Sequence, residues 1–122
     1  MDYETFEKKV SAQAGVPRDR ARVLIRATLQ TLGDRITRGE ARDLAAQLPK
    51  QMKDWVGTGQ PEAEKFGVEE FIRRVGDRAR VPPEEAQKAA KAVFSTLREA
   101  VTGGEFKDIM SQLPKEFSEL VE

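Results

Sequence analysis

Two acidic pairs recur at one spacing in this sequence and could do chemistry. Glu40 and Asp43 are three residues apart, and so are Glu105 and Asp108. Side chains three apart on a helix point the same way, so each pair could hold a hard cation or serve as acid and base. Each pair also falls in the expected first turn of a helix, where negative charge complements the helix dipole. We interpret them as helix-start residues and predict neither a metal site nor a catalytic site.

A row of arginines could bind phosphate. Arg18, Arg22 and Arg26 lie four residues apart along one expected helix. The guanidinium group donates two parallel hydrogen bonds to phosphate, and helix-turn-helix proteins place such side chains on DNA. However, 21 basic residues balance 21 acidic ones, whereas DNA-binding domains usually carry a basic excess. The row is therefore a candidate nucleic-acid patch or, alternatively, a solvated helix face.

Three further residues could belong to an interaction surface, namely Gln47, Trp55 and Gln112. Each glutamine stands directly before a Leu-Pro pair, where it could cap a backbone group inside the fold or bind a partner. Trp55 shares helical spacing with Met52 and Val56, which favours a core position. If Met52, Trp55 and Val56 are exposed instead, they form an apolar patch of the kind that marks a partner surface.

Other chemistry is excluded by composition. The chain has no cysteine and no histidine, so thiolate chemistry and zinc sites built on these residues are impossible. The glycines around Gly57 and Gly59 lack the Lys-Ser or Lys-Thr of a phosphate loop. No serine has a nearby histidine to act as its base. We predict that the protein is not an enzyme and needs no cofactor.

An internal repeat dominates the sequence. Residues 1–57 align without a gap on residues 66–122, with 19 identities in 57 positions. The longest shared run is Gln47-Leu48-Pro49-Lys50, which returns as Gln112-Leu113-Pro114-Lys115. Residues 58–65 form a linker with glycine, proline and polar residues. The sequence predicts two helical units, 1–57 and 66–122, within one globular domain. The arginine row is not repeated, and its matching residues are Pro83, Gln87 and Lys91.

Apolar residues recur at helical spacing throughout both units. In the first unit we expect helices at about 2–14 and 18–37, a short helix ending before Pro49, and a last one around Trp55. The long second helices should form the central contact, and the glycines at 39, 103 and 104 should end them. The predicted fold class is all-α, with two tandem pseudo-symmetric units of about four helices each packed as one bundle.

The block Ala45-Ala46-Gln47-Leu48-Pro49 carries a family resemblance. It follows Gly39-Glu40-Ala41, a Phe6…Val10 helix and an Ala-rich central helix. The chain thereby resembles, over nearly its whole length, a small bacterial family known as domain of unknown function 2267. That family has an arginine, a glycine and aromatics after Leu-Pro, whereas here only an aromatic is kept. The resemblance implies an all-α fold and a bacterial source, and it implies no activity.

These observations favour a non-enzymatic protein-interaction or structural module of the bacterial cytoplasm. The N-terminus has no apolar run behind its acidic residues, and no window of about 18 apolar residues occurs, so we expect neither a signal peptide nor a membrane span. The expected partner is a protein. A nucleic-acid-binding domain that uses Arg18, Arg22 and Arg26 is the alternative, and a homo-oligomeric scaffold is a third possibility. The sequence leaves the oligomeric state open.

Overall fold

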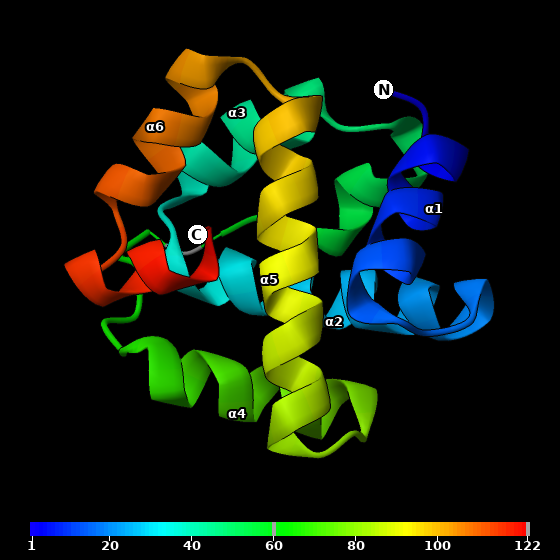
Figure 1. Ribbon diagram of the computed structural model, residues 1–122. Coiled ribbons are helices and arrows are strands. Elements are labelled where there is room, and N and C mark those ends of the chain that lie inside the picture. The colour runs from blue at the N-terminus through cyan, green and yellow to red at the C-terminus, as the bar shows by residue number, and fades with distance from the viewer. Residues whose placement is uncertain (60, 122) are drawn as a thin grey trace.

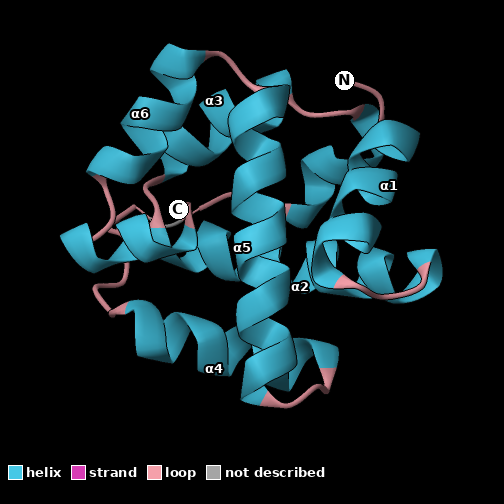
Figure 2. Ribbon diagram, in the orientation of Figure 1, coloured by secondary structure: helices cyan, strands magenta, loops and turns pink. Residues whose placement is uncertain are grey.

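The computed structural model describes residues 1–59 and 61–121, and this part of the chain contains helices and no β-strand (Figure 2). Gln60, in the predicted linker, and Glu122, the last residue of the predicted second unit, lie outside the described residues. The α-helices and the two 3-10 helices, η1 and η2, are α1 (Tyr3–Ala14), α2 (Arg18–Arg35), α3 (Arg38–Gln47), η1 (Lys50–Trp55), α4 (Val68–Ala79), α5 (Pro83–Ala100), α6 (Gly103–Ser111) and η2 (Lys115–Leu120).

The order of the helices repeats from the first half of the chain to the second. Helices α1 and α4 each have 12 residues, and α2 and α5 each have 18. A shorter helix follows in each half, α3 in the first and α6 in the second, and a 3-10 helix comes last. The repeat in the sequence therefore appears as a repeat of secondary structure.

Local residue types explain where these helices begin and end. The Asp2 side chain accepts a hydrogen bond from the Thr5 N–H and caps α1, and Gly15 ends that helix in the left-handed region at φ 68°. The expectation that Gly39 ends α2 is wrong. Helix α2 ends at Arg35, Ile36 is extended, and Gly39 lies inside α3.

The expectation that Gly103 and Gly104 end α5 is also wrong. Gly103 and Gly104 lie inside α6, while extended Val101 follows the end of α5. A threonine then caps each short helix, because the Thr37 and Thr102 hydroxyls accept hydrogen bonds from the backbone N–H three residues ahead. An extended residue followed by a capping threonine therefore makes the break that the glycines were expected to make.

The helices of the two halves interlock. Helix α1 packs on α5 and α4 packs on α2, so each half lays its first helix on the long helix of the other half. In Figure 1, α5 runs through the middle of the molecule in front of α2, and α3 and α6 lie together at one end. Helices α2 and α5 also contact each other, as expected, and near their starts Arg20 Nε donates to Glu85 Oε1 over 2.6 Å.

One apolar core joins all of these helices. Its centre in the second half is an aromatic cluster, in which the Phe71 ring stands edge-on to Phe94 and Phe117 at centroid distances of 5.8 and 5.4 Å. Among the described large apolar residues, only Met1 and Val23 are exposed. Within residues 1–59 and 61–121, none of the helices has the length and apolar character needed to cross a membrane.

Candidate functional site

Helices α3 and α6 are held together by reciprocal hydrogen bonds from the two glutamines. Gln47 Oε1 accepts from the Thr102 N–H over 2.8 Å, and Gln112 Oε1 accepts from the Thr37 N–H over 2.9 Å. Each glutamine therefore binds the backbone at the start of the other short helix. The structure places Gln47 and Gln112, two of the predicted interaction residues, in contacts within the chain, with Gln47 exposed and Gln112 partly buried. We call these paired contacts the glutamine clamp.

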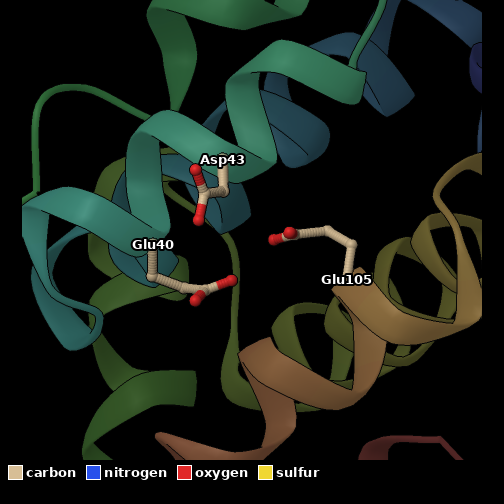
Figure 3. Close-up of side chains that lie close together, drawn as sticks. All are labelled: Glu40, Asp43 and Glu105. Atoms are coloured by element: carbon tan, nitrogen blue, oxygen red, sulfur yellow. The ribbon is translucent and has the colours of Figure 1, made fainter.

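The glutamine clamp brings three carboxylates to one place. In Figure 3, Glu40 of α3 and Glu105 of α6 extend toward each other, and the Asp43 carboxylate of α3 lies beside them. One oxygen from each carboxylate lies within 4.8 Å of the other two. Glu40 is 9% exposed and Glu105 is 7% exposed, whereas Asp43 is open to solvent. Sequence spacing identified these residues within each helix, but it gave no sign that α3 and α6 would face each other.

One oxygen of each buried carboxylate lacks a hydrogen-bond partner. Glu40 Oε1 and Glu105 Oε2 are buried without a hydrogen bond, and no lysine or arginine of the described chain forms an ion pair with either residue or with Asp43. Burial, then a hydrogen bond with Glu40, and then the negative charges of Glu40, Asp43 and Asp108 raise the pKa of the Glu105 carboxyl to about 8. This acidic cluster, defined as Glu40, Asp43 and Glu105, could therefore take up a proton or a cation near neutral pH.

The acidic cluster predicts an unusual pH dependence of stability. Between its ordinary pKa of 4.5 and about 8, the folded protein holds a proton on Glu105 that the unfolded chain releases. Stability falls with rising pH wherever the folded state binds more protons. We expect the unfolding temperature of cation-free protein to fall by several degrees from about pH 5 to about pH 8. Calorimetry of the protein in EDTA, at fixed ionic strength, measures this unfolding temperature at each pH.

The matched variant for this prediction is Glu105→Gln, which should have a flatter profile because it cannot ionise. Parallel profiles for the two proteins would contradict the prediction.

The pKa of Glu70 is shifted in the opposite direction, since hydrogen bonds from Arg73 and Arg74 lower it to about 2. Its contribution is present above about pH 4.5 and is lost only as the pH falls toward 2. The two effects therefore occupy separate pH windows.

The arginine row is partly occupied by contacts inside the fold. Arg18 and Arg22 pair with Glu7 of α1, with Nη2–Oε2 distances of 3.8 and 3.4 Å, and the Glu7 side chain is 5% exposed. The Arg22 guanidinium also lies over the Tyr3 ring at 5.3 Å from its centroid. Arg26 is exposed. The carboxylate of Glu7 thus offsets charge that the sequence alone assigned to a phosphate-binding surface.

Trp55 belongs to the same region of the first half. Its ring stands edge-on to Tyr3 with centroids 5.6 Å apart, and the side chain is half-buried. Met52 and Val56, its neighbours in the predicted patch, are buried. These contacts and the Glu7 pairs lie between α1, the start of α2 and η1.

The equivalent surface of the second half is an open groove of about 660 Å³ between α4, the start of α5 and η2, which we call the α4–α5 groove. Val68, Ile72 and Pro83 give it apolar walls. Its exposed carboxylates, which form no ion pair with another described residue, are Glu69, Glu84 and Glu119. Sequence reasoning missed this groove. The signal was present in the repeat, because Ile72, Pro83 and Gln87 replace Glu7, Arg18 and Arg22.

Comparison with known proteins identifies a family whose description names no activity. The family model described as an uncharacterized conserved protein (DUF2267) matches residues 3–120, which include every helix from α1 to η2. No curated protein matches the chain. Indications of function therefore come from the groove and from the clusters of side chains themselves.

Proposed function

The chain belongs to the DUF2267 family, whose description names no activity, and we propose from its structure that it is a non-enzymatic protein-interaction module of the bacterial cytoplasm. Its α4–α5 groove would bind a basic, amphipathic segment of a partner protein. The observation that carries this proposal is the combination of apolar walls and unpaired carboxylates in a hollow of about 660 Å³. Apolar area supplies affinity, while complementary charge supplies specificity and speed of association.

The first half supplies an internal precedent for such an occupant. At the positions matching Ile72 and Gln87, Glu7 and Arg22 form an ion pair beside the Tyr3 ring. A basic side chain is therefore already seated on this type of surface within the same chain. The α4–α5 groove has carboxylates and apolar walls, and the arginine that lines it, Arg73, is already paired with Glu70 and Asp77. Because the counterpart of Glu7 is Ile72, a lysine or arginine from a partner would meet the free carboxylates of Glu69, Glu84 and Glu119 instead.

We test the proposal with two fluorescein-labelled helical peptides of equal length, one Lys/Leu-rich and one Glu/Leu-rich. The basic peptide should bind, the acidic one should not, and the amide signals that shift in NMR spectra should map to α4, α5 and η2. Glu84→Lys should weaken binding of the basic peptide about five- to tenfold, as expected for loss and reversal of a rim charge worth about 1 kcal/mol.

The repeat offers a matched control. Asp19 occupies the position of Glu84 in the first half and is also exposed, so Asp19→Lys changes the net charge equally but lies outside the groove. It should alter binding by less than about twofold. Equal weakening by both variants, or equal binding of both peptides, would contradict the groove assignment.

We infer that the halves are related by an approximate two-fold axis, and the reciprocal glutamine clamp and the meeting of Arg20 with its repeat partner Glu85 support this relation. Of the three arginines in the row, Arg26 is exposed and forms no described ion pair, which favours the nucleic-acid alternative. Titration with labelled DNA distinguishes the protein-interaction module from the nucleic-acid alternative. DNA binding that weakens with salt and is lost in Arg26→Ala would favour the alternative.

A further inference from the structure

We propose that Glu40, Asp43 and Glu105 bind a hard divalent cation, such as Ca²⁺ or Mn²⁺, at the contact between α3 and α6. This site is separate from the α4–α5 groove and does not depend on the function proposed for it. The cation would connect two helices that come from different halves of the chain.

The spacing of the carboxylates fits a shared ion. Oxygen atoms that bind one Ca²⁺ or Mn²⁺ ion at about 2.0 to 2.6 Å are at most about 5 Å apart. One oxygen from each of the three carboxylates already lies within 4.8 Å of the other two. Small side-chain rotations would therefore suffice, and α3 and α6 need not move.

Each of the two buried glutamates in this cluster has one buried oxygen without a hydrogen bond. Glu40 Oε1 and Glu105 Oε2 make no hydrogen bond, and their side chains are more than nine-tenths buried. If both buried carboxylates are ionised, they repel each other, and their burial is unfavourable unless a proton or a cation compensates the charge. The glutamine clamp holds the starts of both helices together, so the backbone positions that carry Glu40 and Glu105 stay close while it is intact. A bound cation would satisfy both oxygens at once.

The donor set selects the class of ion. All three ligands are carboxylate oxygens, which suit Ca²⁺, Mn²⁺ and Mg²⁺, whereas zinc sites favour histidine and cysteine. Asp43 is exposed, so it gives an entering ion access to solvent and leaves room for water molecules as the remaining ligands. Asp108, the repeat partner of Asp43, is outside the group of converging oxygens.

The test measures calorimetric binding and thermal unfolding of EDTA-treated protein with CaCl₂, MnCl₂ or MgCl₂, at constant ionic strength set with NaCl. We expect at least one of the three cations to bind and to raise the unfolding temperature by several degrees. Asp43→Asn should weaken binding at least about tenfold, whereas Asp108→Asn should change it less than about threefold. Glu105→Gln should abolish the cation-dependent rise while raising the unfolding temperature of the metal-free protein.

Three results would overturn the proposal. The first is no binding of any of the three cations at roughly 5 mM, beyond the range of weak calcium modules. The second is equal weakening by Asp43→Asn and Asp108→Asn, which would indicate diffuse attraction to negative charge. The third is stabilisation by Glu105→Gln with no cation response in the wild type, which would identify a carboxyl pair that shares a proton. Asp43 is exposed, so its variant should fold, and circular dichroism checks this.

Discussion

Replacing Gly33 by alanine should destabilise the protein by about 3 kcal/mol, since forcing extra atoms into a packed contact typically costs about 1 to 3 kcal/mol and occasionally more. Gly33 lies in α2, and a Cβ atom there would overlap the backbone carbonyl oxygen of Val56. Backbone cannot rotate away as a side chain can. The segment after η1 would have to move off α2, and Trp55 would move with it.

The measurement is urea-induced unfolding followed by Trp55 fluorescence, which also reports a changed environment in the folded state. Gly39→Ala is the control, because a Cβ at Gly39 meets nothing within 4 Å. Alanine in an exposed helix position is favoured over glycine by about 0.5 to 1 kcal/mol, so this control should be neutral or stabilising. If the two variants unfold at the same urea concentration, the close approach of Val56 to α2 is not a constraint.

Replacing Phe71 by alanine should cost about 3 to 5 kcal/mol, the usual range for removing a fully buried phenylalanine. Phe71 is completely buried, and its ring contacts Phe94 and Phe117 edge-on at interplanar angles of 83° and 89°. The substitution leaves a cavity among α4, α5 and η2, and both edge-to-face pairs are lost. Because native domains are only marginally stable, this loss is a large share of the total, and a measurable fraction of the variant should be unfolded at physiological temperature.

Chemical unfolding at low temperature, followed by circular dichroism, gives the free energy of unfolding of this variant. Phe106→Ala serves for comparison, since Phe106 is only partly buried, and it should lose about half as much or less. A loss for Phe71→Ala no larger than that for Phe106→Ala would mean that the aromatic cluster is not the centre of the core. The dependence of the free energy of unfolding on urea concentration should stay unchanged if the folded state keeps its compactness.

The acidic cluster and the α4–α5 groove make different demands on the fold. The acidic cluster needs α3 and α6 held together by the glutamine clamp, whereas the groove needs only α4, α5 and η2. Cation binding and peptide binding can therefore be lost separately. A variant such as Asp43→Asn should leave peptide binding intact, and Glu84→Lys should leave cation binding intact.

The amino-acid sequence alone determined the helical architecture. Apolar spacing predicted only helices, and the first of them, expected at about 2–14, spans Tyr3–Ala14. Helical periodicity is a local property, so it survives in the sequence without any knowledge of packing. The family resemblance drawn from the Gln-Leu-Pro block is confirmed by the family match. The stops at Gly39 and Gly103 were wrong because extended Ile36 and Val101, followed by capping threonines, end the long helices instead.

Only the tertiary structure decided which side chains meet. Glu40 and Glu105 lie in different halves of the chain, and nothing in the spacing within either helix says that α3 will face α6. The partner of the arginine row could not be predicted from spacing either, because Glu7, which pairs with Arg18 and Arg22, comes from a different helix. Local spacing fixes the face on which a residue lies, whereas the partner across that face depends on the packing of whole helices. The acidic cluster and the α4–α5 groove are both products of that packing.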